Sequence, residues 1–334
     1  MVIDLHAHVG DFRWSPAETR PVMSFQALIA RLDDERIDRA VLLPVYNASP
    51  EQFPWAFLAH GGMSVREQVL EAERYRDRLV AFGNMDPRWG GNSDRTDFSP
   101  MLDWFQTHGC RGIGEVTANI PFDDPRTINL FRQLGRRGLP VTIESCNSGW
   151  GLGLQDDPGS PRLERLLRAC PETVVIGHGP GFWAELGPVE SQAAKMGYPR
   201  GAIRTEGSLA RLLRSFPNLY ADLSAKSAFN ALARDLEYGI RFITEFQDRL
   251  LFGTDIVSRD LSKGSVEREQ VAELIDGMLA EGAASERLLA ALSWHNGVMP
   301  QRQYLETLAE RGRISRSTLG AILGGNAEKL LDLA

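Results

Sequence analysis

Eight short, nearly continuous apolar runs recur along the chain, and they constrain the fold more than any other feature of the sequence. Each run is rich in Val, Ile, Leu or Phe and shows little alternation between apolar and polar residues. Strands that are covered on both faces have this pattern, as in a parallel sheet packed between helices. The predicted strands are Val2–Leu5, Ala40–Pro44, Leu79–Asn84, Gly112–Val116, Val141–Glu144, Val174–Gly177, Leu219–Leu223 and Leu250–Gly253.

Amphipathic segments with typical helix boundaries separate these runs. Serine at the cap, proline at the first helical position and glycine after the last turn mark such boundaries. The serines that we expect to open helices are Ser24, Ser64, Ser99, Ser160 and Ser208. A strand followed by a helix, eight times over, predicts an α/β fold of the (β/α)8 TIM barrel type. A doubly wound open sheet is the alternative, but no GxGxxG sequence follows the first strand.

The sequence after the eighth predicted strand is mostly helical in pattern, and its clearest helices are Ser285–Leu292 and Ser317–Leu331. No linker rich in Pro, Gly or Ser and no internal repeat divides the chain. We therefore expect one barrel domain over residues 1–334, with extra C-terminal helices. The long connection Gly179–Gly207 is expected to form a loop over the mouth of the barrel.

Composition and charge exclude several classes of protein. A net charge of −7 disfavours a nucleic-acid surface, although it leaves room for a local basic pocket. The three cysteines are widely spaced and form no CxxC pair, which favours a reducing compartment. No apolar run approaches the ~20 residues of a membrane span, and the N-terminal apolar run is too short for a signal peptide. We expect a cytoplasmic protein that acts on a small molecule, with neither nucleic acid nor membrane as a partner.

Ionisable side chains stand at the C-terminal ends of five predicted strands, where barrels of this type carry their functional groups. They are His6 and His8 after the first strand, Glu115 in the fourth, Glu144 in the fifth, His178 after the sixth and Asp255 after the eighth. Residues i and i+2 of a strand point to the same side, so His6 and His8 can offer two nitrogens to one ion. Asp255 or Glu115 would add a carboxylate. A metal with an open coordination position lowers the pKa of its bound water to about 7.

Each of these residues also has a simpler interpretation. The two histidines can be surface or capping residues, Asp255 can cap a helix, and His178 between glycines can lie in a turn. Glu115 and Glu144 can pair with arginines such as Arg111. Carboxylates at the ends of apolar strands are nevertheless unusual unless a cation meets them. Because all six groups fall at the same end of the predicted barrel, together they favour a metal site.

Several segments resemble the amidohydrolase superfamily, and most closely its branch with aminocarboxymuconate semialdehyde decarboxylase and related hydrolases. The matching motifs span nearly the whole chain and are MVIDLHAH, VVIGHGPG, LYADLSA, LLFGTDIVSRD and GNAEKLL. The resemblance implies that His6, His8 and Asp255 bind metal, commonly zinc. It also implies that His178 binds a second metal or contacts the substrate. Family members are often dimers, so a homodimer is expected.

The chain departs from the family pattern at the fifth strand, where members usually carry a histidine. Here the strand reads Val-Thr-Ile-Glu and ends at Glu144. The sequence GIGEV around Glu115 resembles branches in which a glutamate bridges two metals. The resemblance thus implies a site for one or two ions made of His6, His8, Glu115, Glu144, His178 and Asp255. Because the site has more oxygen ligands than usual, manganese or iron become plausible beside zinc.

These residues predict hydrolysis of a small-molecule amide, ester or lactone by metal-activated water. Asp255 would take the proton from the water and deliver it to the leaving group, and His178 would stabilise the oxyanion or hold a second metal. Two alternatives stay open: a metal-dependent non-oxidative decarboxylase of the same branch, and a barrel that has lost catalysis and acts as a binding protein. Glu144 in place of histidine keeps the last alternative open. Arg13 and Lys226 are expected to hold a substrate carboxylate, unless they are exposed loop charges.

Overall fold

Parallel strands at the positions of the eight apolar runs form the centre of the computed structural model. It describes residues 1–12, 21–44, 63–146, 152–258, 268–282 and 300–333. The strands are β1 (Ile3–Ala7), β2 (Arg39–Leu42), β3 (Leu79–Ala81), β4 (Ile113–Val116), β5 (Val141–Cys146), β6 (Leu154–Gln155), β7 (Val175–His178), β8 (Leu219–Asp222) and β9 (Leu250–Leu251). All eight predicted strands are present, and the short strand β6 is an addition that pairs with the end of β5.

Backbone hydrogen bonds connect these strands around the barrel. One sheet has the order β1-β2-β3 and the other the order β4-β5-β7-β8-β9, with parallel pairing throughout. Between β3 and β4, the Gly83 N–H donates to the Gly112 carbonyl at 2.9 Å. Between β9 and β1, the Leu5 N–H donates to the Phe252 carbonyl at 2.8 Å. The fold is the (β/α)8 barrel that the sequence predicts.

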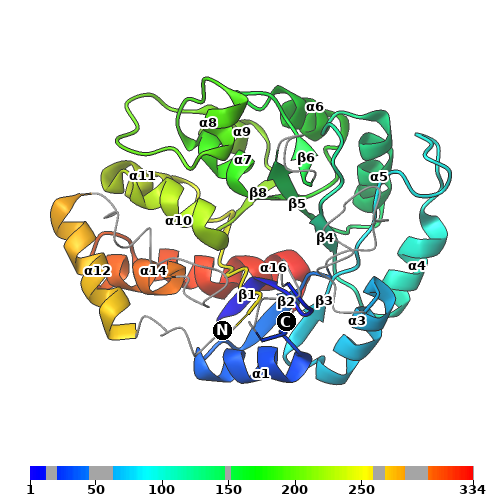
Figure 1. Cartoon of the computed structure of the whole chain (residues 1–334), viewed down its shortest axis with the longest axis horizontal. Coiled ribbons are helices and arrows are strands. Elements are labelled where there is room, and N and C mark those ends of the chain that lie inside the picture. The colour runs from blue at the N-terminus through cyan, green and yellow to red at the C-terminus, as the bar shows by residue number, and fades with distance from the viewer. Residues whose placement is uncertain (13–20, 45–62, 147–151, 259–267, 283–299, 334) are drawn as a thin grey trace.

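Helices form an outer layer around the strands (Figure 1). Those between β1 and β9 are α1 (Phe25–Asp34), α3 (Val65–Ala72), η1 (Glu73–Tyr75), α4 (Ser99–Thr107), α5 (Pro125–Arg136), α6 (Pro161–Ala169), α7 (Pro180–Trp183), η3 (Ala184–Leu186), α8 (Gln192–Met196), α9 (Ser208–Ser215), α10 (Ala225–Ala233) and α11 (Leu236–Glu245). After β9 come α12 (Arg268–Glu281), α14 (Gln301–Glu310), α15 (Arg316–Gly320), η5 (Ala321–Gly325) and α16 (Asn326–Leu331). Among the described residues, none of these helices has both the length and the apolar character needed to cross a membrane.

Serine side chains cap the first two predicted helices but not the later ones. Ser24 and Ser64 each accept a hydrogen bond from a backbone N–H of the first helical turn. Ser160 occupies the cap position of α6 in a left-handed conformation and makes no capping bond. Ser99 and Ser208 are the first residues of their helices rather than the caps. The Ser208 hydroxyl donates instead to the buried Glu185 carboxylate at 2.8 Å. The local sequence cannot reveal this tertiary contact.

The segment Gly179–Gly207, predicted as a loop, contains the short helices α7, η3 and α8. Lys195 and Glu185 form an ion pair at 2.7 Å inside it, and each side chain is 2% exposed. The Trp183 indole N–H donates to the backbone carbonyl of Asp222 in β8 at 2.9 Å. The segment is therefore not a loop throughout, because buried pairs and tertiary contacts fold part of it into short helices.

The C-terminal helices pack against the strands themselves. The predicted helix Ser317–Leu331 is present as the succession α15, η5 and α16, whereas Ser285–Leu292 lies outside the described residues. Ala327 and Leu331 of α16 belong to one apolar cluster with residues of β1, β2, β3, β7 and β9. The end of the chain therefore completes the apolar packing of the barrel.

A buried ion pair joins the first strand, the first helix and the segment after the last strand. Arg31 of α1 donates to the Asp4 carboxylate at 3.1 Å and to the Thr254 hydroxyl at 2.8 Å. Asp4 is fully buried and accepts three more hydrogen bonds, from the Thr254 N–H at 2.9 Å, from the Thr254 hydroxyl at 2.6 Å and from the His6 N–H at 3.1 Å. Because Thr254 precedes Asp255, this network fixes the backbone that carries a predicted site residue.

Removal of the Arg31 guanidinium should destabilise the fold strongly. Arg31→Met keeps much of the side-chain volume but leaves the Asp4 carboxylate buried without its cation, which costs about 3–5 kcal/mol. Chemical unfolding measures the loss. Arg168→Met is the control, because Arg168 forms an exposed i,i+4 pair with Glu164, and such pairs contribute only about 0.3–0.5 kcal/mol. Equal stability of the two variants would contradict the role given to the buried pair.

Candidate metal centre

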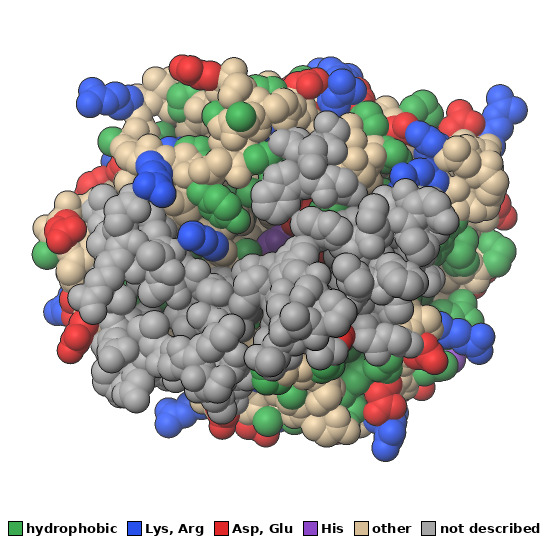
Figure 2. Space-filling view, viewed as in Figure 1, with side chains coloured by type: hydrophobic (Ala, Val, Ile, Leu, Met, Phe, Trp, Pro, Cys, Tyr) green, Lys and Arg blue, Asp and Glu red, His purple; other side chains and the backbone are tan. Residues whose placement is uncertain are grey.

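The six predicted site residues converge at the C-terminal end of the barrel. Their ligand-type atoms form three overlapping groups, and within each group the atoms lie within 4.8 Å of one another. The groups are His6, His8 and Glu115; His6, His178 and Asp255; and Glu115, Glu144 and His178. In the space-filling view, a histidine is visible inside a hollow of the molecular surface (Figure 2). The structure therefore brings together every residue of the predicted metal site.

Strand register and local backbone conformation aim these side chains at one another. Glu144 and His178 are direct partners in the pairing of β5 with β7. Gly179 follows with a φ of 92°, and a Cβ there would lie 2.2 Å from a Glu144 carboxylate oxygen, so glycine is required for this approach. Asp255 has a φ of 57°, which aspartate tolerates better than most residues, and its N–H donates to the His6 carbonyl at 2.9 Å.

Hydrogen bonds to the Nδ1 atoms of His6 and His8 leave their Nε2 atoms for a ligand. His8 Nδ1 lies 2.8 Å from the Leu43 carbonyl oxygen, which only accepts, so Nδ1 carries the proton. His6 Nδ1 lies 2.5 Å from a carboxylate oxygen of Asp222. The two Nε2 atoms face each other at 2.9 Å, a distance that requires a proton or a metal ion between their lone pairs.

Asp222 of β8 links two of the site histidines, and it is a functional residue that the sequence predictions did not include. Its Oδ2 lies 2.5 Å from His6 Nδ1 and 3.1 Å from His178 Nδ1. The Ser224 hydroxyl donates to the same oxygen at 2.8 Å and lies 2.9 Å from His178 Nδ1. Burial would raise the pKa of the Asp222 carboxyl, but both histidines outweigh it and hold that pKa well below its usual range. An acid inside an apolar strand was the available signal, since such a carboxylate needs buried partners.

The glutamates of the site differ sharply in their affinity for protons. Burial raises the pKa of Glu144 well above its ordinary value, and the charges of Glu115 and Asp255 raise it further. Burial has the same effect on Glu115, but the hydrogen bond and charge of His6 outweigh it and lower its pKa to about 2. Burial lowers the pKa of His6, whereas the neighbouring aspartates raise it well above its ordinary value. Glu144 and His6 therefore hold protons that a bound cation would displace.

The spacing and chemistry of these donors fit divalent metal ions. Two ligand atoms on a tetrahedral zinc ion lie about 3.3 Å apart, because each is about 2.0–2.1 Å from the metal. His8 Nε2 lies 3.2 Å from Asp255 Oδ1, and His6 Nε2 lies 3.6 Å from the same oxygen. His178 Nε2 lies 3.5 Å from Glu144 Oε2. Three imidazole nitrogens with three carboxylates are a donor set that suits zinc, manganese or iron.

The simpler interpretations of these residues disagree with the geometry. Both histidines of the first strand are buried rather than exposed. In the described ranges, the ion pairs of Glu115 and Glu144 involve histidines and no arginine. Arg111 precedes β4, at the opposite end of that strand from Glu115. The two glutamates therefore face the histidine cluster rather than an arginine partner.

The structure says less about Arg13 and Lys226, the two residues predicted to hold a substrate carboxylate. Arg13 lies outside the described residues. Lys226 is partly buried in α10, and its ammonium lies 5.8 Å from the centroid of the Tyr198 ring. Lys226 lies two residues after Ser224, whose hydroxyl contacts His178. A role for Lys226 in substrate binding stays a prediction.

Comparisons with known proteins give one family and a set of structural relatives. The family model described as Amidohydrolase matches residues 3–333. A probable 2-pyrone-4,6-dicarboxylic acid hydrolase from Acinetobacter baumannii, with citric acid bound, has a TM-score of 0.56 at 13% identity over 99% of each chain. 5-carboxyvanillate decarboxylase from Sphingomonas paucimobilis has a TM-score of 0.54 at 14% identity, over 99% of this chain and 98% of that one.

A third solved structure, an amidohydrolase from Burkholderia multivorans with bound zinc, has a TM-score of 0.51 at 16% identity over 99% of each chain. No curated protein matches the sequence. At these low identities, the likeness to solved structures shows the barrel fold and leaves the reaction open.

Divalent metal should bind more tightly as the pH rises through the acid range and on through neutral pH, because the pKa of His6 lies well above its ordinary value. His6 and Glu144 hold protons in the metal-free site because both pKa values are raised, and metal binding must release those protons. Calorimetry of zinc and manganese binding in buffers of different ionisation enthalpy measures the release. His8→Ala should lose metal, while His108→Ala should not, because His108 pairs with Glu73 elsewhere on the molecule. Less than ~0.1 metal ion per chain after addition of either metal would contradict a metal centre.

Glu144→His, which introduces the residue that the sequence resemblance leads one to expect, should still bind metal but shift its preference toward zinc. The expected reason is that an imidazole nitrogen replaces a harder carboxylate oxygen beside His178. Competition between zinc and manganese for the wild-type and variant proteins measures the preference. If both proteins choose the two metals in the same ratio, Glu144 does not contribute to ion binding.

Proposed function

The chain belongs to the amidohydrolase family, and from this membership and the geometry of the site we propose that it is a metal-dependent hydrolase of a small-molecule amide, ester or lactone. The observation that carries the proposal is the convergence of three imidazoles and three carboxylates at the C-terminal end of one barrel. A divalent ion, when bound, supplies Lewis-acid polarisation of a carbonyl and lowers the pKa of water enough for attack near neutral pH.

The donor groups divide into sets for one or two ions. His6, His8 and Asp255 would hold the first ion, and Glu115, Glu144 and His178 would hold the second. Zinc is the leading metal by the family resemblance, and the oxygen-rich second set also suits manganese or iron. Asp222 positions one histidine of each set, because its Oδ2 contacts the Nδ1 atoms of both His6 and His178.

Asp255 is the residue best placed to move a proton during hydrolysis. Its side chain is 17% exposed, more than those of the other site residues that it contacts. The carboxylate can therefore meet a water or a substrate that enters the hollow. It would accept the proton of the attacking water and return it to the leaving group. His178, whose Nε2 lies 3.8 Å from Asp255 Oδ2, would stabilise the oxyanion if it does not hold an ion.

The same donor set also serves a non-oxidative decarboxylase, and the solved structures similar to this chain include a hydrolase and a decarboxylase. The products separate the two reactions. Hydrolysis consumes water and forms an acid with an alcohol or amine, whereas decarboxylation releases carbon dioxide. Lys226 is proposed to hold a carboxylate of the substrate in either case. If the chain binds metal but catalyses neither reaction, it acts as a binding protein, the alternative that glutamate in place of histidine at position 144 suggested.

Asp255→Asn should reduce turnover of any amide, ester or lactone that the wild-type chain hydrolyses by about 10²-fold or more. Asparagine keeps the shape of the side chain but removes its negative charge and its basicity. Steady-state kinetics measure the loss, and thermal unfolding and metal content show whether fold and site are retained. Asp248→Asn is the matched control, because Asp248 has a side chain that is 72% exposed. Near-wild-type turnover of Asp255→Asn would mean that Asp255 has a structural role only.

A further inference from the structure

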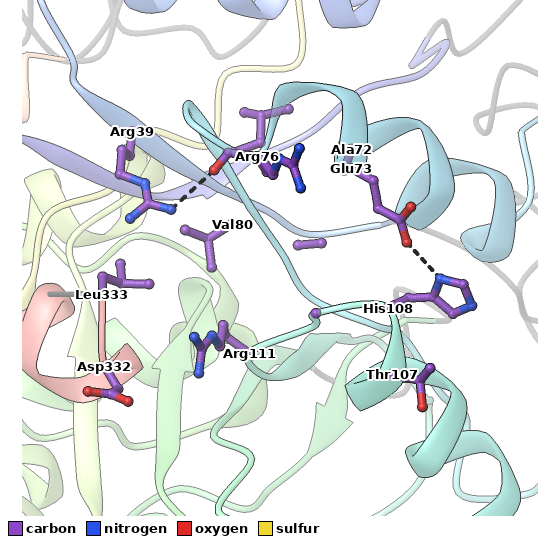
Figure 3. Close-up of a pocket in the computed structure, with 13 residues that line it drawn as sticks. Arg39, Ala72, Glu73, Arg76, Val80, Thr107, His108, Arg111, Asp332 and Leu333 are labelled. Carbon is purple, nitrogen blue, oxygen red and sulfur yellow. Dashed lines mark hydrogen bonds and ion pairs between the residues drawn. The ribbon is translucent and has the colours of Figure 1, made fainter.

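A cavity of about 480 Å³ lies at the opposite end of the barrel from the metal centre. Its lining includes Arg39 and Leu79, the first residues of β2 and β3, and Arg111, which shortly precedes β4. Residues after α16 at the end of the chain also line it (Figure 3). Because the strands are parallel, their first residues lie at the other end of the barrel from the site residues. The cavity is therefore separate from the candidate metal centre.

Three arginines from different segments line this cavity: Arg39, Arg76 and Arg111 (Figure 3). Arg39 donates to the Arg76 backbone carbonyl at 3.3 Å, and its Nε atom is buried without a hydrogen-bond partner. Over the described residues, no hydrogen bond or ion pair involves the guanidinium of Arg76 or of Arg111. A buried donor without a partner is unfavourable, and an acceptor in the cavity would relieve Arg39 Nε. Arg76 and Arg111 are exposed, so their guanidinium groups are free to turn toward a ligand in the cavity.

The acids of the lining do not balance these arginines. Two carboxylates line the cavity, Glu73 and Asp332. The Glu73 carboxylate is already engaged by His108 Nδ1 at 2.6 Å, and the two carboxylates face three arginines. The whole chain carries a net charge of −7, so this local positive charge is opposite to that of the molecule. Several guanidinium groups that share one cavity repel each other unless an anion lies between them.

The size and walls of the cavity favour an organic anion over a bare inorganic ion. Leu79, Val80 and Leu333 contribute apolar surface to the lining. The volume falls within the range of small-molecule sites, about 300–1,000 Å³. A phosphate ester presents three terminal oxygens in different directions and can meet three guanidinium groups, whereas a planar carboxylate suits a single arginine fork.

We propose that this cavity binds a small organic phosphate. Arg39, Arg76 and Arg111 hold the phosphate dianion, and the apolar wall receives the organic part of the ligand. The site does not depend on the reaction at the metal centre, because it is built from the first residues of the strands and from the turns that precede them.

Calorimetric titration of the metal-loaded protein with phenyl phosphate at low salt tests the proposal. One molecule should bind per chain, more tightly than inorganic phosphate does, and binding should weaken as salt is added. Arg111→Met should lower the affinity about tenfold or more, and Arg111→Lys should lower it less. Arg74→Met is the matched control, because Arg74 lies two residues from Arg76 but pairs with Glu71 at 3.1 Å. It should bind phenyl phosphate as the wild type does.

Phosphate groups also bind metal ions, so the same titrations are made with His8→Ala, which should still bind phenyl phosphate. Binding that is lost in His8→Ala and kept in Arg111→Met would place the ligand at the metal centre and overturn the proposal. Absence of any binding to the wild-type protein would overturn it too. Equal affinity for inorganic and phenyl phosphate would overturn the assignment of an organic ligand. Arg111 is exposed, so Arg111→Met should unfold at the wild-type temperature and its binding data remain interpretable.

Discussion

The contact of one carboxylate oxygen with two imidazoles is the interaction on which the candidate site depends. Asp222 Oδ2 reaches the Nδ1 atoms of His6 and His178, and so it joins β8 to β1 and β7 within the barrel. Because Nδ1 is occupied on each ring, the Nε2 atoms are left for the centre of the site. The adjacent strand must leave space for this arrangement: a Cβ on Gly253 would lie 2.6 Å from Asp222 Oδ1. In the short sequence Gly253-Thr254-Asp255, Gly253 leaves space for Asp222. Thr254 binds Asp4, and Asp255 itself lies at the site.

The two ends of the barrel use charge in different ways. At the C-terminal end, acids and histidines are buried together, and the raised pKa values of both Glu144 and His6 indicate a site that lacks positive charge. At the N-terminal end, the three arginines around the cavity outnumber its two acids. Between them, the Asp4–Arg31 pair brings opposite charges together within the structure and fixes the backbone beside Thr254. A buried charge that meets an opposite charge within the protein is structural. A group of like charges without enough opposite charge can instead bind a ligand.

The sequence predicted the strands well because burial on both faces produces a continuous apolar run that local context does not disguise. It also predicted that the six candidate residues lie together, since the ends of parallel strands meet at one end of a barrel. Asp222 was missed because it lies inside such a run and looks like part of the strand. The hydroxyl of Ser208 and the helices within Gly179–Gly207 depend on contacts with distant segments, so their local sequence does not determine them.

The sharing of Asp222 has a consequence for how this site can change in evolution. Replacement of that aspartate would release His6 and His178 together, so a tolerated change there requires compensating substitutions on three strands at once. Glu144 is held differently, because it interacts with other members of the site and its carboxylate lies against Gly179. A substitution at this position leaves the remaining framework in place. The fifth strand is thus the place where the site can exchange one ligand type for another without loss of this framework.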